Sequence, residues 1–222
     1  VDAVTTDAPG SVTLNGNVLA STVTIGEAAP SVCGQVGSGG GAVSFAGAVS
    51  LCGTTTISAT DAQFNGAIDS NASGARALTV NASGTTNFIG LVGATRALAS
   101  LATNGTGVSR FSAGTAAQAT VRTTGAQAYN QAVQLVATAA GQPRTFTSTT
   151  SGAIACAGTV EAAGSGAANL TINTTGQTSC AGAVGGVDDA QGRAAIDRGQ
   201  GAGVAVVDDG CILGQELGAQ LA

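Results

Sequence analysis

Hydrophobic and small polar residues alternate along most of the chain, in short runs such as SVTL, TVTI, VSF, LTV, LTI and VAV. Alternation with a period of two predicts short strands that bury one face. Corners rich in Gly or in Asn, Ser and Thr separate the runs, and Gly and β-branched residues are too dense for helices. Only the end differs, where Leu213, Leu217 and Leu221 recur at every fourth position. A short C-terminal helix or cap and one further strand are both open there.

Two internal repeats organise the strands. Residues 77–88, ALTVNASGTTNF, match residues 169–180, NLTINTTGQTSC, at an offset of 92, and residues 32–49 match residues 51–68 at an offset of 19. Strands this short bury little alone, so the repeats predict coils that stack on one another. We therefore expect an all-β solenoid with coils of roughly 19–25 residues, spaced by about 4.8 Å.

We expect a single domain over residues 1–222. It comprises N-terminal strands at 1–31, the repeated coils at 32–186 and a charged C-terminal cap at 187–222.

Residues one coil apart should lie directly above one another. The offset of 19 aligns Phe45 with Phe64, and Phe88 lies one further coil along the chain, which predicts a stacked aromatic core of Phe45, Phe64 and Phe88. The offset of 92 aligns Phe64 with Cys156 and Phe88 with Cys180. We therefore expect the two sulfurs to occupy the equivalent pair of places.

The cysteines have the spacing of coil-to-coil disulfides. A separation of about 4.8 Å between stacked Cα atoms lies inside the range that a disulfide needs. We predict bridges Cys33–Cys52 and Cys156–Cys180; the alternative is two pairs of reduced, buried thiols. Cys211 is left over, either as an inert free thiol or as a link between subunits. Disulfides would indicate an oxidising, extracellular compartment.

Composition narrows the classes of function. Only 9% of the residues are charged, the net charge is −5, and all seven basic residues are arginines. A basic face for nucleic acid or anionic lipid is therefore not expected, and no apolar run is long enough for membrane insertion. The chain has no His, so we expect no metal site and no cofactor. It also has no Met, which indicates a processed N-terminus; the composition favours removal of a secretion signal.

Three further features have alternative interpretations. The one cluster of charges is interpreted as a solvated cap, with a catalytic or calcium site as the alternative: Asp188, Asp189, Arg193, Asp197, Arg198, Asp208, Asp209 and Glu216. Five Asn-x-Ser/Thr sequons are explained equally well by chance or by ladders of stacked Asn: Asn71, Asn81, Asn104, Asn169 and Asn173. The threonine runs at 54–58 and 145–150 raise ice binding, although they do not recur in register.

Residues 43–186 resemble the repeat of large bacterial exoproteins of the filamentous-haemagglutinin-like group. The resemblance rests on the alternating strands, on the corner in FNGAIDSNASGARALTVNASGTTNFIGLVG and on TTGAQAYNQAVQLVA. It implies a right-handed parallel β-helix that is secreted and acts in adhesion or as an extracellular scaffold.

These observations predict an extracellular or cell-surface structural protein and not an enzyme. Our first expectation is a fibre or matrix subunit that polymerises head to tail, because the ends of a solenoid present unpaired strands. The alternatives are an adhesin passenger that binds host or surface glycans and an ice-binding solenoid.

Overall fold

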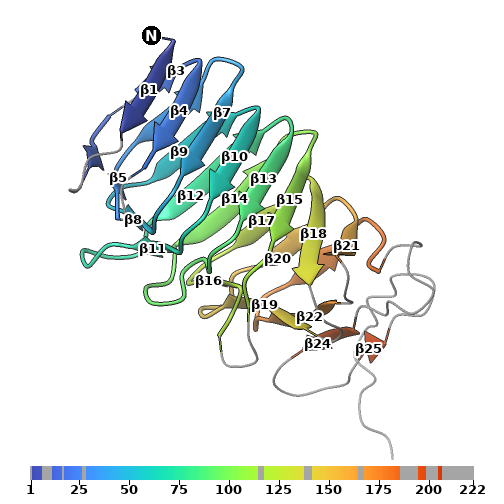
Figure 1. The fold of residues 1–222 in the computed structure, drawn as a ribbon. Coiled ribbons are helices and arrows are strands. Elements are labelled where there is room, and N and C mark those ends of the chain that lie inside the picture. The colour runs from blue at the N-terminus through green and yellow to red at the C-terminus, as the bar shows by residue number, and fades with distance from the viewer. Residues whose placement is uncertain are drawn as a thin grey trace, which may run out of the picture.

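A computed structural model gives the fold of the protein as a β-solenoid of about seven turns (Figure 1). The structure describes residues 2–6, 12–16, 18–26, 29–114, 118–137, 142–164, 168–185, 195–198 and 205–206, the last two ranges by backbone alone. The described residues contain no helix. The all-β solenoid predicted from the alternating pattern is confirmed, whereas residues 207–222, including the expected terminal helix or cap, lie outside the described residues.

Each coil crosses three faces in turn, and the strands of each face form a parallel sheet along the solenoid. The first face holds β1 (Ala3–Thr6), β4 (Thr22–Ile25), β7 (Ala42–Phe45), β10 (Asp61–Phe64), β13 (Thr85–Phe88), β15 (Val108–Phe111), β18 (Ala132–Ala137) and β21 (Val160–Gly164). The second holds β2 (Thr13–Leu14), β5 (Ser31–Val32), β8 (Val49–Leu51), β11 (Ile68–Ser70), β16 (Val121–Thr123), β19 (Gln142–Ser148), β22 (Ala168–Asn173) and β24 (Ala195–Arg198). The third holds β3 (Val18–Ala20), β6 (Gln35–Ser38), β9 (Thr55–Ala59), β12 (Ala77–Ala82), β14 (Ser100–Asn104), β17 (Gln127–Tyr129), β20 (Ile154–Cys156) and β23 (Thr178–Cys180).

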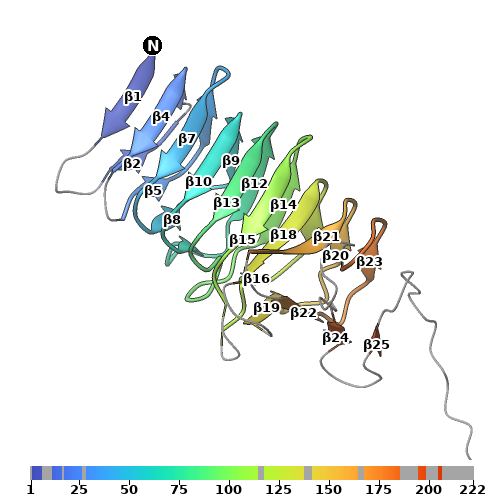
Figure 2. The same ribbon diagram turned by 45° about the vertical axis from the view of Figure 1, so that its right-hand side comes forward.

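The second face is continuous across its middle coil. On this face no described strand separates β11 from β16 in space. Instead, Val92 forms a parallel bridge with Ile68 on one side and with Val121 on the other. Beyond β24, the short β25 (Ala205–Val206) pairs with it in the antiparallel sense. The strands within residues 1–31 already belong to these sheets, so regular stacking begins with β1 (Figure 2).

The coils lengthen along the chain. On the first face Ala42 pairs with Asp61, whereas in the next coil Gln63 pairs with Asn87, a longer step along the sequence. The step from Val133 to its partner Val160 is longer still and exceeds the predicted range of coil lengths. The extra residues lie partly in longer strands, since β18 and β19 have 6 and 7 residues where β7 and β8 have 4 and 3, and partly in the connections.

Stacked phenylalanines fill the centre of four consecutive coils. Phe45 and Phe64 have ring centroids 5.3 Å apart and nearly parallel planes, and Phe64 and Phe88 repeat this spacing. The predicted stack is therefore confirmed, and the structure extends it to Phe111, 4.8 Å from Phe88. All four rings are fully buried, because strand alternation points every second residue inward.

Glycine permits the close approach of one corner to the next. A Cβ added to Gly90 would lie 2.3 Å from the backbone of Gly66, and one added to Gly182 would lie 2.5 Å from Gly158. Both distances are far below any real Cβ contact, so a side chain at these corners would push the coils apart. This stacking of corners accounts for part of the glycine content.

The offset of 92 does not superpose equivalent places, and the expectation that the cysteines replace the phenylalanines is wrong. Following the first face from Phe64 through four coils leads to Ala162 and not to Cys156. Cys156 instead lies on β20 of the third face, in register with Tyr129 on one side and Cys180 on the other. The repeated stretches, residues 77–88 and 169–180, lie on different faces. They are similar because every face consists of a short strand followed by a tight corner.

We predict that Phe88→Ala lowers the free energy of unfolding by about 3–5 kcal/mol, because it opens a cavity between two stacked rings. Ile89→Ala is the matched control, since the neighbouring Ile89 side chain is 44% exposed. Urea unfolding followed by far-UV circular dichroism measures both changes. Equal losses for the two variants would contradict the buried stack.

Candidate functional site

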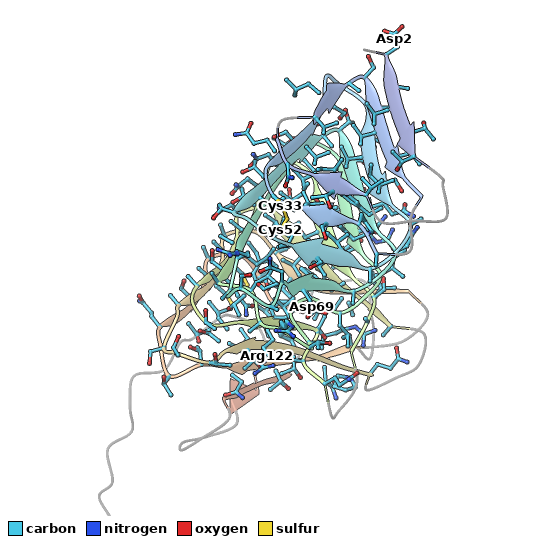
Figure 3. The ribbon with its side chains drawn as sticks, turned by 90° about the vertical axis from the view of Figure 1, so that its left-hand side faces the viewer. Asp2, Cys33, Cys52, Asp69 and Arg122 are labelled. Carbon is cyan, nitrogen blue, oxygen red and sulfur yellow. A yellow bond between two sulfur atoms is a disulfide. The ribbon has the colours of Figure 1, made fainter. Side chains whose placement is uncertain are left out.

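Two of the acidic side chains that the structure describes, Asp61 and Asp69, support the backbone of the next coil. Asp61 accepts a hydrogen bond from the Thr85 amide at 2.6 Å. Asp69 accepts from the backbone N–H groups of Thr95 and Arg96 at 3.0 and 2.9 Å, and it lies on the second face (Figure 3). Each carboxylate thus holds the next coil. No group of three or more metal-ligating side chains gathers within the described residues.

Cys33 and Cys52 form a disulfide between consecutive coils, as the sequence predicts (Figure 3). Their Cα atoms are 4.7 Å apart, the distance that stacked positions provide. Cys33 follows β5 and Cys52 follows β8, and the Cys52 amide donates to the carbonyl of Val32. The bridge therefore reinforces a corner whose backbone is already hydrogen-bonded from coil to coil.

Cys156 and Cys180 are in register on β20 and β23, but they are thiols in the structure. The predicted second disulfide is therefore not formed there, and the alternative of two buried thiols describes the pair. A hydrogen bond with the Cys156 thiol lowers the pKa of Cys180, while burial acts in the opposite direction. The two sulfurs lie in stacked positions, as expected. Stacked positions permit a disulfide, but they do not require one.

Arg144 is a buried cation that the sequence predictions did not include. Its side chain is 2% exposed and donates only to neutral acceptors: the carbonyls of Phe111, Ser112, Val136 and Pro143 and the amide oxygen of Gln142. These acceptors lie in or next to β15, β18 and β19, so the guanidinium joins two neighbouring coils. The alternating pattern could have predicted its burial, because Arg144 lies two positions before the buried Phe146 and therefore on the same side of the strand.

The core becomes polar and aromatic where the phenylalanine stack ends. Tyr129 packs edge-on to Phe111 and donates to the side-chain oxygen of Gln127 at 2.8 Å. Gln127 in turn donates to the Thr123 hydroxyl and the Thr147 carbonyl. Burial, and then the nearby Cys156, raise the pKa of Tyr129, which keeps the phenol a neutral donor. This network is structural, since it is enclosed by the coils.

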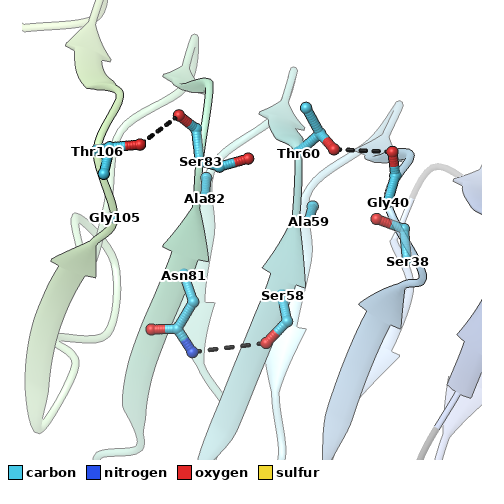
Figure 4. Close-up of a pocket in the computed structure, with 10 residues that line it drawn as sticks. All are labelled: Ser38, Gly40, Ser58, Ala59, Thr60, Asn81, Ala82, Ser83, Gly105 and Thr106. Carbon is cyan, nitrogen blue, oxygen red and sulfur yellow. Dashed lines mark hydrogen bonds between the residues drawn. The ribbon is translucent and has the colours of Figure 1, made fainter.

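A hollow of about 380 Å³, lined by small uncharged residues, follows the corner between the third and first faces (Figure 4). It is lined by Ser38, Gly40, Ser58, Ala59, Thr60, Asn81, Ala82, Ser83, Gly105 and Thr106. Its side chains are neutral, and several are engaged from coil to coil. Thr60 donates to the Gly40 carbonyl at 2.8 Å, and Thr106 donates to the Ser83 carbonyl at 3.1 Å.

An asparagine ladder borders the hollow. The sequence suggested internal ladders of asparagine at turns, whereas this ladder lies on the outside of the solenoid and includes two of the five sequon residues, Asn81 and Asn104. The Asn130 amide donates to Asn104 at 2.7 Å, Asn104 donates to Asn81 at 2.9 Å, and Asn81 contacts Ser58 at 3.5 Å. The ladder satisfies polar groups along the outside of the third face. Hydroxyl and amide groups without charge make this surface suited to neutral, hydrogen-bonding ligands.

The outward threonines stack only two at a time. Thr56 pairs with Thr79, but their neighbours in the column are Gln35 and Ala102. On the second face Thr145 pairs with Thr171, which is followed by Asp197. These two columns therefore do not form the regular rows of threonine that an ice-binding face needs.

Two of the expected features lie largely outside the described residues. Cys211 is among these, as are the acidic residues of the C-terminal cluster apart from Asp197. The backbone of Asp197 and Arg198 forms part of β24 and pairs with Thr171 and Ile172.

Comparison of the chain with protein-family models, curated proteins and solved structures finds no match. In the part of the chain that the structure describes, there is no helix long and apolar enough to cross a membrane.

We predict that peptide mapping without reduction recovers Cys33 linked to Cys52, and that Cys156 and Cys180 react with an alkylating agent once the chain is unfolded. Replacing Cys33 and Cys52 together by Ser should lower the free energy of unfolding by about 3 kcal/mol, the entropy of a loop of this size. The Cys156→Ser variant is the control, because it breaks no bridge in the structure. A native Cys156–Cys180 bridge would contradict the thiol state described above.

Proposed function

We propose that this protein is a non-catalytic, extracellular structural solenoid whose copies join end to end. The observation that carries the proposal is the first coil, which offers a nearly complete surface for one more coil. Among the strands that the structure describes, β1, β2 and β3 are each the outermost of their sheet and pair on one side only. Three unpaired strand edges therefore lie together at one end of the solenoid (Figures 1 and 2).

The apolar interior reaches this end as well. Val4, Leu14 and Val18 pack against the core but are only partly buried, whereas Val23 and Ile25 of the next coil are fully buried. Another coil stacked on the end would bury the first set in the same way. Apolar burial and backbone pairing would then act together, as they do between coils within the chain.

The backbone groups of β1 show which atoms would pair. The amides of Thr22 and Gly26 donate to the carbonyls of Asp2 and Thr6, so the even-numbered residues of β1 face β4. Groups on one strand alternate between its two edges. The N–H and C=O of Ala3 and Thr5 therefore face the open edge.

The extracellular part of the proposal has separate support. A disulfide between neighbouring coils suits an oxidising compartment. The neutral outer ladders, in which side chains bind the neighbouring coil, suit a structural protein.

We predict that Thr5→Pro abolishes end-to-end assembly of the full chain, because proline removes an N–H from the open edge and breaks no bond to β4. Thr5→Val is the matched control, since it changes the same exposed side chain and keeps the N–H. Static light scattering across a concentration series gives the mass of both variants and of the parent chain. The parent and Thr5→Val should form species larger than one chain, and Thr5→Pro should remain monomeric.

Two results would contradict this proposal. The first is a parent chain that stays monomeric at the highest concentration. The second is assembly by Thr5→Pro equal to that of the parent, with an unchanged β-sheet spectrum in circular dichroism, which would show that copies associate elsewhere than through β1.

The hollow favours a second candidate function, adhesion to neutral glycans along the corner between the third and first faces. Its side chains offer hydroxyl and amide groups without charge, the chemistry that pairs with sugar hydroxyls. This candidate needs only the flank of the solenoid and is compatible with either a monomer or a fibre.

We predict for this candidate that Ser58→Trp, which fills the hollow, eliminates binding on a glycan array. Ser44→Trp is the control, because Ser44 lies on an outward position of the first face. Equal binding by both variants would remove the hollow as the adhesive surface, and loss of binding in Ser58→Trp alone would support it.

A further inference from the structure

One sequon lies outside the strands. Asn71, Ala72 and Ser73 belong to the turn that follows β11 and precedes β12, at the corner between the second and third faces (Figure 1). Residues 72–75 are all exposed. Two hydrogen bonds from the backbone fix the base of the turn. The backbone N–H of Asn71 donates to the Leu51 carbonyl at 2.9 Å, and the backbone N–H of Arg76 donates to the Ser70 hydroxyl at 2.9 Å.

The Asn71 side chain is held with its nitrogen unused. Its oxygen Oδ1 accepts the backbone N–H of Ser73 at 3.1 Å, which closes a turn between the first and third residues of the sequon. Its nitrogen Nδ2 has no hydrogen-bond partner among the described residues. The hydrogen bond therefore positions the side chain while leaving the nucleophilic nitrogen available.

The other four sequons are placed differently. The side-chain nitrogens of Asn81 and Asn104 are used in the asparagine ladder. Asn169 and Asn173 are exposed and lie in β22, whose backbone pairs with β19 at both positions, whereas β24 pairs only with Thr171 and Ile172. Each asparagine is therefore held in the sheet on one edge, Asn173 as the last residue of its strand. A paired strand must leave its sheet to enter the cleft of an enzyme.

We propose that Asn71 is an acceptor for N-linked glycosylation, and that the fold selects it over the other four sequons. A transferase would supply a sugar activated as a nucleoside or lipid pyrophosphate. A bond forms between Nδ2 and the anomeric carbon, the bond from that carbon to the phosphate oxygen breaks, the pyrophosphate departs with the electron pair, and a proton from Nδ2 passes to a base of the transferase. The Ser73 hydroxyl, two positions on, is the second group that the sequon requires.

A sugar at this position is compatible with both candidate functions. The turn lies on the side of the solenoid, away from the open edges of β1, β2 and β3. It also lies at a different corner from the hollow, which follows the corner between the third and first faces. Glycosylation of Asn71 would therefore add a hydrophilic group to the flank without covering either surface, and its test is independent of theirs.

The experiment uses the purified full chain, UDP-glucose and a soluble transferase that recognises Asn-x-Ser/Thr. The folded chain and the reduced chain in urea compatible with the enzyme are treated in parallel, and the modified residues are located by peptide mass spectrometry. We expect one hexose, on Asn71, in the folded chain and modification of several sequons in the unfolded chain.

Two conservative variants control for folding. Asn71→Asp keeps an oxygen that accepts the Ser73 N–H and removes the nucleophile, and Ser73→Ala keeps that N–H and removes the hydroxyl. Both should lose the hexose from the folded chain, whereas Asn81→Gln should retain it. The proposal is overturned if the folded chain is modified mainly at another sequon, if it is unmodified while the unfolded chain is modified, or if neither state is modified.

Discussion

Parallel strands bring side chains of neighbouring coils into register, and in the first coils side chains of the same kind lie one above another. Within the core this produces the rings of Phe45, Phe64, Phe88 and Phe111, at centroid distances of 4.8–5.3 Å. At a corner it produces the Cys33–Cys52 disulfide, and on the outside the asparagine ladder. These are covalent, apolar and polar versions of one constraint, because each joins positions that the backbone register has already brought together. Small residues suit such a structure, since a coil needs little volume to fill its interior and tight corners to stay in register.

The constraint is local, and the longer coils show what happens when it weakens. After Phe111 the next residue on the first face is Leu135, and the aromatic rings move to Tyr129 and Phe146 on the other two faces. The interior then contains Gln127, Thr123 and Arg144, and hydrogen bonds replace part of the apolar contact. A buried arginine without a carboxylate is stabilised only by the many carbonyls around it. Its position is consistent with the need to fix connections that no longer repeat from coil to coil.

The sequence was most informative where two residues are one coil apart. The strand alternation predicted the solenoid, and the offset of 19 predicted both the Phe45–Phe64 contact and the Cys33–Cys52 bridge. The offset of 92 misled, because similar strand-and-corner phrases occur on all three faces and similarity over many coils does not fix the face. Cys156 and Cys180 were correctly placed one above the other, but on the third face and as thiols. Arg144 was not found, since its acceptors are backbone carbonyls, which the side-chain sequence does not record.

The distribution of satisfied polar groups explains why the ends and the turns, more than the flat flanks, are the places to look for function. Along the flanks, amides and hydroxyls bind the neighbouring coil, as Asn104 binds Asn81 and Thr60 binds the Gly40 carbonyl. A ligand at such a surface must compete with bonds that the protein already makes, which reduces the net gain. The open edge of β1 makes no such bonds in this chain, and neither does Nδ2 of Asn71 among the described residues. A new partner at either place would add interactions without removing any, which is the physical basis of both proposals, assembly at the end and modification at the turn.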